Sequence, residues 1–230
     1  MKFTILTLFP DYFNSPLSVS LLKKAQENSL LEVEIVNIRD YAQEPHKQVD
    51  DTPYGGGAGM ILKPDVLAEA VRALKTKESK VILPDPGGRK FDQKLASTLS
   101  KESNLILIAG RYEGVDQRFK NKYVDLEISL GDFVLNGGEV ACLAIIEASA
   151  RLIPGVIGSS ESLDSESFTS QTINGKEVQL LEYPQYTKPV EFEGEKVPDV
   201  LLSGNHEQIK VWRQEKSLEK TKKIRPDLLK

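Results

Sequence analysis

Along residues 1–158, short apolar runs alternate with segments whose apolar positions recur at a helical period. The apolar runs predict strands at residues 2–9, 31–38, 81–84, 105–110 and 124–131. The periodic segments predict helices at residues 17–28, 64–74 and 139–152. Some of these strands are almost wholly apolar, which is typical of strands that are covered on both faces. The alternation therefore predicts an α/β domain with a largely parallel sheet.

The pattern changes after Gly158. Residues 159–171 are polar, acidic and rich in serine, and they have no apolar period, which predicts a linker. The chain is therefore expected to divide into an α/β domain at 1–158, a linker at 159–172 and a small, mainly helical domain at 173–230.

Two elements are predicted in that C-terminal domain. The Asn174-Gly175 pair stands between short apolar stretches and predicts a hairpin. Residues 203–223 predict a helix, which either Ser203 or Asn205 is expected to cap.

The composition excludes several classes of protein. With 230 residues, of which 40% are hydrophobic, the chain is long enough to bury a core. The single cysteine, Cys142, cannot form an internal disulfide, which favours a reducing compartment, the cytoplasm. One Cys and two His are too few for a Cys/His zinc site, so no metal ligands are assigned. No apolar run approaches the ~20 residues of a membrane span, so no contact with a membrane is expected.

Charge is distributed unevenly along the chain. The net charge is −4, but residues 206–230 carry eight Lys or Arg against four Asp or Glu, a net +4, which leaves −8 for the remainder. A basic tail on an acidic body fits local contact with phosphates. The same charges are also typical of a solvated helix face, and both interpretations stay open.

Glycine-bearing loops follow three of the predicted strands, at residues 85–88, 110–114 and 130–138. Ligands of parallel sheets bind beyond the carboxyl ends of the strands, so these loops are expected to form the site. The longest, SLGDFVLNGGE (129–139), has four large apolar residues that suit the flat ring of a purine: Leu130, Phe133, Val134 and Leu135. A simple glycine-rich turn between strand and helix would not need them.

Two other segments have alternative interpretations. In GRYEG (110–114) a donor fork, a ring and an acceptor stand together, but Glu113 is also placed to form a salt bridge with Arg111. YGGGAGM (54–60) either lets the backbone approach a ligand or partner closely or forms a flexible loop. The chain has no G-x-x-x-x-G-K-[ST], no G-x-G-x-x-G after the first strand and no G-x-S-x-G, which argues against the common nucleotide-binding and hydrolase folds.

Nine stretches in order cover nearly the whole chain and together resemble the tRNA (guanine-N1)-methyltransferase family of the SPOUT superfamily: TLFPDYF, VDDTPYGGGAGM, GGRKFDQ, GRYEGVDQR, SLGDFVLNGGE, ARLIPGV, YPQYTKP, VPDVLLSGNH and WRQEKSLEKT. The resemblance implies a trefoil-knotted α/β domain and a homodimer whose active sites are each built from two chains. It also implies methylation of guanosine 37 of tRNA, with S-adenosylmethionine as methyl donor. The C-terminal domain would grip the anticodon branch, and the linker would order over the donor.

The resemblance also carries over the residues of the donor site. These are Pro86, Gly110, Tyr112, Glu113, Leu130, Gly131, Asp132, Phe133, Val134, Leu135, Gly137 and Gly138.

The chemistry requires a base and a cation. Guanine N1 becomes a good nucleophile only when its proton leaves, so a carboxylate within hydrogen-bond reach is expected. Deprotonation moves charge onto O6, which an arginine stabilises. The resemblance assigns these roles to Glu166 and Arg151, with Asp164 as a rival base because Asp is the more usual residue at the place of Glu166. The linker after Phe168 is also longer than is usual in the family.

Alternatives to these roles stay open. Arg151 follows a helix, where a cation is favourable in any case, and Asp164 and Glu166 also suit solvated charges. Mg²⁺ is a possible cofactor, held through water by Glu113, Asp164 and Glu166. The second hypothesis for function is a related knotted methyltransferase with another RNA target, and the third is a non-catalytic RNA-binding module.

Overall fold

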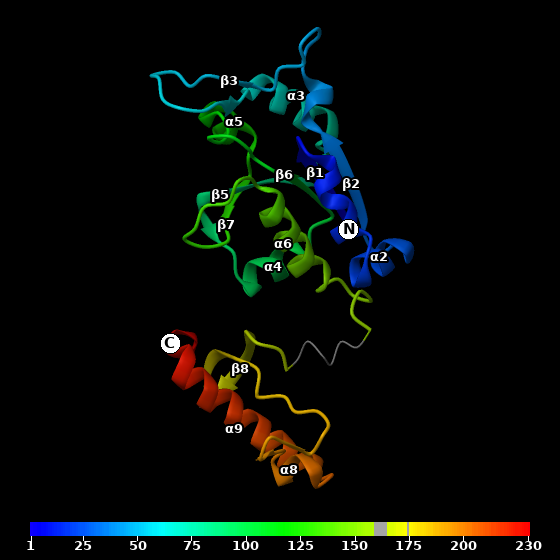
Figure 1. Cartoon of the computed structure of the whole chain (residues 1–230), viewed down its shortest axis with the longest axis vertical. Helices are drawn as coiled ribbons and strands as arrows, with labels where there is room; N and C mark the ends of the chain where they lie inside the picture. Colours follow the sequence, from blue (N-terminus) through cyan, green and yellow to red (C-terminus); the bar gives the residue numbers. More distant parts are fainter. Residues whose placement is uncertain (159–164, 174) are drawn as a thin grey trace. The chain divides into compact units, whose positions relative to one another are not determined.

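The computed structural model describes residues 1–158, 165–173 and 175–230. The chain forms two compact units, Met1–Gly158 and Ser159–Lys230. In Figure 1 the first unit runs from blue to green and the second from yellow to red. Asp164 and Asn174, which carry two of the sequence predictions, lie outside the described residues.

A five-stranded sheet in the order β2-β1-β6-β5-β7 forms the centre of the first unit, and all of its pairings are parallel. Its strands are β1 (Lys2–Thr7), β2 (Glu32–Asn37), β5 (Ser79–Lys90), β6 (Asn104–Ile108) and β7 (Leu126–Ser129). The predicted α/β class with a parallel sheet is confirmed. A separate two-stranded pair consists of β3 (Asp50–Asp51) and β4 (Ile61–Leu62).

Helices cover both faces of this sheet (Figure 1). The side chains of β6 alternate between two buried clusters, with Leu105 and Leu107 in one and Ile106 and Ile108 in the other. The first cluster is covered by α2 (Ser20–Glu27), α4 (Gln93–Leu99) and α6 (Glu139–Ala150). The second is covered by α3 (Pro64–Leu74) and α5 (Gln117–Tyr123). Burial on both faces explains why β6 is almost wholly apolar.

Two predictions for this unit were wrong in detail. The helix expected at 17–28 is interrupted: the short turns η1 (Pro10–Phe13) and α1 (Asn14–Leu17) come first, Val19 is extended, and α2 begins at Ser20. Strand β5 does not end at Pro84 but resumes its pairing with β7 at Arg89. The predicted loop 85–88 is thus a bulge inside one strand. At Gly88 a Cβ atom would lie 2.5 Å from the Glu127 carbonyl carbon, so only glycine lets the two strands meet again there.

The second unit combines a hairpin with helices. Strands β8 (Thr169–Ile173) and β9 (Lys176–Leu180) pair antiparallel, as the hairpin prediction required. Strand β8 begins at Thr169, inside the segment 159–172 that was expected to be linker, and it pairs with β9 along its whole length. The remaining elements are η2 (Ile38–Tyr41) in the first unit and β10 (Glu191–Phe192), β11 (Glu195–Lys196), α8 (Asp199–Leu202), α9 (His206–Ile224) and η3 (Pro226–Leu229) in the second.

Helix α9 packs on the hairpin through polar contacts. Of the two predicted caps, Asn205 is the one used, because its side chain accepts from the Gln208 N–H at 3.2 Å. Thr221 is fully buried; its hydroxyl donates to the Ser217 carbonyl (2.7 Å) and accepts from the Leu181 N–H (2.8 Å). Among the described residues, no helix is both long and apolar enough to cross a membrane.

Candidate active site

A cavity of about 270 Å³ opens in the first unit, beside the ends of β6 and β7 and the bulge of β5. Its lining includes residues from all three predicted glycine-bearing loops, among them Pro86, Gly110 and Leu130. The volume is close to the lower end, about 300 Å³, of ordinary small-molecule pockets. The sheet thus brings three loops that are far apart in sequence to one site.

All but one of the residues expected to bind the donor line this cavity; these are Pro86, Gly110, Tyr112, Glu113, Leu130, Gly131, Phe133, Val134, Leu135, Gly137 and Gly138. The exception is Asp132, which is exposed. The Phe133 N–H donates to the Gly131 carbonyl at 2.9 Å, and this tight turn leaves Asp132 at its tip, outside the lining. The direct role expected for Asp132 is therefore not supported by its position.

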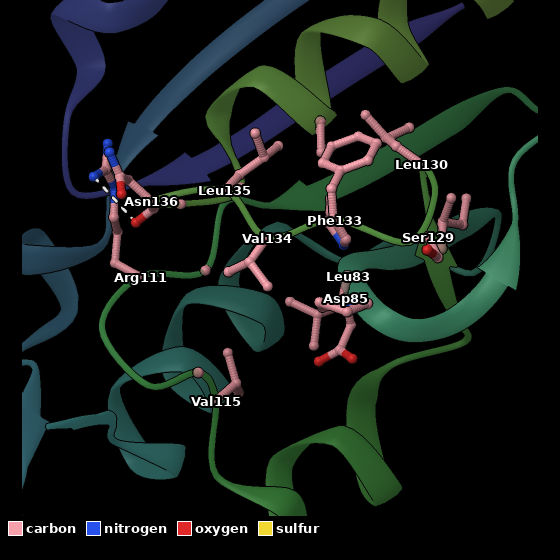
Figure 2. A pocket seen from close by; sticks show the side chains of 18 of the residues that line it. Leu83, Asp85, Arg111, Val115, Ser129, Leu130, Phe133, Val134, Leu135 and Asn136 are labelled. Carbon is pink, nitrogen blue, oxygen red and sulfur yellow. Dashed lines mark hydrogen bonds between the residues drawn. The ribbon is translucent and has the colours of Figure 1, made fainter. Parts of the chain in front are cut away.

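The apolar side chains of the loop are exposed despite their size. Phe133 is 53% exposed and Val134 86%. In Figure 2, Val134 points toward Leu83 and Asp85, while the ring of Phe133 points the opposite way, toward Leu130. Large apolar groups that remain exposed at a cavity are typical of a surface that a ligand or another chain covers.

Gly138 brings two of the cavity loops into backbone contact. Its N–H donates to the Gly110 carbonyl at 2.8 Å. A Cβ atom there would lie 2.8 Å from the Gly110 nitrogen and 2.9 Å from the Ala109 Cα. Because Gly138 has ordinary helical backbone angles, the requirement for glycine is one of space and not of conformation.

A buried ion pair ties the same loops together. Arg111 Nε donates to Glu139 Oε1 at 2.9 Å, and the Glu139 side chain is 2% exposed. Glu139 also accepts from the Thr7 hydroxyl at 3.3 Å, and the Arg111 guanidinium lies 4.4 Å from the centre of the Phe9 ring. The pair therefore joins the end of β1, the loop after β6 and the start of α6.

Arg111 thus pairs with Glu139, and the proposed salt bridge to Glu113 was wrong. Glu113 instead lies against the glycine-rich segment 54–60. Its N–H donates to the Met60 carbonyl at 2.9 Å, and a Cβ atom on Gly59 would lie 2.5 Å from its side chain. The backbone at Gly59 thus approaches the Glu113 side chain of the same chain, and contact of this segment with a ligand or partner stays a prediction.

Asp85 also lines the cavity; its loop was expected at the site, but the residue itself was not among the predicted binding residues. It accepts from Lys120 Nζ at 2.5 Å and from the Gly87 N–H at 2.8 Å, and Lys120 also donates to Glu127 at 3.0 Å. Partial burial alone would raise the pKa of Asp85, but the bonds from Lys120 and Gly87 outweigh it and lower the pKa. Burial likewise opposes the charge of Lys120, yet its two carboxylate partners raise its pKa. Both groups are therefore ionised at neutral pH.

The two residues expected to be catalytic belong to different units. Arg151 is the C-cap of α6 in the first unit. Glu166 lies just before β8 in the second, where its carbonyl accepts from the Thr169 hydroxyl at 2.8 Å. The rival base, Asp164, lies outside the described residues. Within the described part of the chain, no three His, Cys, Asp or Glu side chains gather as a metal site would require.

The basic tail is partly neutralised by its own acids. Lys216 pairs with Glu219 at 2.6 Å and Arg225 with Asp227 at 2.7 Å, and these side chains are exposed. The guanidinium of Arg213 lies 4.8 Å from the centre of the Tyr183 ring. The surface of α9 is thus a solvated, mixed-charge face, and its contact with phosphates remains a prediction.

A family model described as tRNA (Guanine-1)-methyltransferase TrmD matches residues 1–230, the whole chain. The chain belongs to this family. The resemblance drawn from the sequence is therefore confirmed.

Three members of the TrmD family illustrate how close the similarity is, and each carries the name tRNA (guanine-N(1)-)-methyltransferase. The protein of Dictyoglomus turgidum is 52% identical over 229 residues, which cover 100% of this chain and 90% of the relative. That of Citrifermentans bemidjiense is 53% identical, with 100% and 90% covered. That of Clostridium perfringens is 54% identical, with 99% and 93% covered.

Proposed function

We propose that this member of the TrmD family transfers the methyl group of S-adenosylmethionine to N1 of guanosine 37 in tRNA. One observation carries the proposal: a chain that the family matches from end to end has a cavity lined by the very loops that its motifs occupy. The names of the relatives support guanine N1 of tRNA as the target. With tRNA as substrate, the cytoplasm is the compartment that we propose.

The cavity suits a purine nucleoside. Leu130, Val134 and Leu135 offer an apolar surface for the ring, and the glycines beside them expose backbone groups that can bond with its polar edge. The close approach at Gly138 fixes the distance between the loop that carries these residues and the loop that begins at Gly110. The donor supplies a methyl carbon on a positively charged sulfur, and the residues around it have to hold it in line with N1.

In the proposed reaction, the Glu166 carboxylate removes the N1 proton of guanine and keeps it. The charge that moves onto O6 is stabilised by the Arg151 guanidinium. A bond then forms between N1 and the methyl carbon as the bond from that carbon to sulfur breaks, and its electron pair stays on sulfur. Arg151 and Glu166 stand in different units of the chain, so the reaction needs both units.

Three further features belong to the proposal through family membership. They are a trefoil knot in the first unit, a homodimer in which two chains build each active site, and a C-terminal domain at 173–230 that grips tRNA beyond a linker at 159–172. The exposed Phe133 and Val134 agree with cover by another chain or by the substrate. Mg²⁺ is proposed only as a possible cofactor, and methyl transfer with and without a chelator tests it.

The proposal is tested with labelled S-adenosylmethionine and tRNA transcripts that differ only at position 37. The transcript with guanosine should be methylated and the one with adenosine should not. Methylation of both would favour a related methyltransferase with another target. Methylation of neither would favour a non-catalytic RNA-binding protein.

The catalytic roles are tested by substitution. Glu166→Gln should abolish turnover while leaving donor affinity unchanged, because it removes the base and keeps the shape. Arg151→Ala should slow transfer on the order of 10²-fold through loss of O6 stabilisation. Asp164→Asn is the matched control. If it cripples transfer and Glu166→Gln does not, then Asp164 is the base.

A further inference from the structure

Asp85 is one of the charged residues that line the cavity. It stands in the bulge of β5, directly before Pro86, while the wall around it is largely apolar. Figure 2 shows Asp85, Val115 and Val134 grouped around one space. A carboxylate in such a wall can accept hydrogen bonds from a ligand in the cavity.

The orientation of this carboxylate is fixed on both oxygens. Lys120 Nζ donates to Oδ2 at 2.5 Å, and the Gly87 N–H donates to Oδ1 at 2.8 Å. The side chains of Lys120 and Asp85 are only 12% and 25% exposed. Since an ionised carboxylate has about four lone-pair sites, these bonds leave accepting capacity on each oxygen.

We propose that Asp85 accepts hydrogen bonds from the ribose hydroxyls of the methyl donor, and that Lys120 is a positioning residue that holds its carboxylate for this contact. The inference rests on the proposed function, because it takes the ligand to be an adenine nucleoside. The ribose is joined directly to the purine, so a polar acceptor near the apolar loop 130–135 lies where the sugar has to be. A carboxylate accepts from such hydroxyls in dinucleotide-binding folds, which shows that the pairing is chemically suitable.

Besides the ribose, the amino acid group of the donor has hydrogen-bond donors, on its ammonium. If that ammonium bound Asp85, it would lie close to the Lys120 ammonium, which is already paired with the Asp85 carboxylate. Two like charges on one carboxylate repel each other, whereas a neutral hydroxyl does not. The local charge thus favours the ribose over the amino acid group as the partner of Asp85.

Binding of S-adenosylhomocysteine to the whole protein, measured by calorimetry, tests the inference. Asp85→Asn should weaken binding about tenfold, the size of a hydrogen bond to a charged group. Glu127→Gln is the matched control, because it removes the other carboxylate on Lys120 without touching the cavity lining, and it should stay within about twofold of wild type. Thermal melting of each variant separates loss of contact from loss of fold, and Asp85→Ser serves if the amide variant does not fold.

Competition by 5′-methylthioadenosine, which keeps the ribose but lacks the amino acid group, identifies the partner. Asp85→Asn should weaken its binding by the same factor as that of S-adenosylhomocysteine. A loss confined to S-adenosylhomocysteine would overturn the inference, since Asp85 would then contact the amino acid group. Unchanged affinity for both ligands would overturn it as well, and the role of Asp85 would then be structural, as the partner of Lys120 in a salt bridge between β5 and α5. Failure of the wild-type protein to bind either ligand would contradict the proposed function instead.

Discussion

Gly138→Ala tests the idea that close backbone contact shapes the cavity. The added Cβ would lie 2.8 Å from the Gly110 nitrogen and 2.9 Å from the Ala109 Cα, and neither backbone atom can turn aside as a side chain could. Overpacking of this kind costs about 2–3 kcal/mol. Replacing glycine by alanine in a permitted conformation also stabilises the fold by about 0.4–1 kcal/mol, because it lowers the conformational entropy of the unfolded chain. The net loss should be about 1–2 kcal/mol.

That loss is measurable by differential scanning calorimetry. For a domain of this size it corresponds to a fall in Tm of about 2–8 °C. Gly158→Ala is the control, because its Cβ would meet nothing within 4 Å. Since Gly138 lines the cavity, affinity for S-adenosylhomocysteine should fall too. A Tm and an affinity equal to those of the control would refute the argument that the contact at Gly138 shapes the site.

Three other predictions concern contacts that lie inside one unit or the other. Arg111→Met should lower the free energy of unfolding, measured in urea, by about 3 kcal/mol or more, because it leaves the buried Glu139 carboxylate without its cation. Adding Glu139→Gln should recover most of this loss. A loss below about 1 kcal/mol for Arg111→Met would contradict the reasoning. For the pair of Lys120 and Asp85, the lowered pKa of Asp85 adds stability above the usual aspartate pKa of about 3.9, and the raised pKa of Lys120 adds stability below about 10.4. The stability lost in Lys120→Met should therefore be constant from about pH 5 to 9 and shrink on both sides, whereas a difference that grows in acid would contradict the pairing. Thr221→Val should lower the stability of the second unit by about 1–3 kcal/mol, because it leaves the Leu181 N–H, just after β9, without its acceptor. The fluorescence of the single tryptophan follows the unfolding, and Thr221→Ser should restore the stability.

The elements that the sequence predicted well are those whose signals are local. Helix α3 begins at Pro64 and ends at Leu74, as expected, because proline sets its first turn and its apolar residues recur at a helical period. The central strands β1 and β6 were visible because both of their faces are buried. Helix α5 was not predicted, since its seven residues contain one buried side chain, Phe119, which is too few to define a period.

The parts that could not be predicted depend on contacts between distant residues. The second half of β5 pairs with β7 only because Gly88 lets the strands meet, and nothing near residue 88 indicates that partner. Arg111 had a carboxylate two residues away, but folding brings Glu139 to it from 28 residues away. Asp85 was missed for a similar reason, because Lys120 makes it part of a network only in three dimensions.

The central claim is that this chain methylates guanine N1 of tRNA at position 37. The most direct test is to digest tRNA after reaction with S-adenosylmethionine and to locate the methyl group by mass spectrometry of the fragments. One methyl group is expected, on N1 of guanosine 37. A methyl group on a ribose 2′-oxygen, on another base or at another position would contradict it.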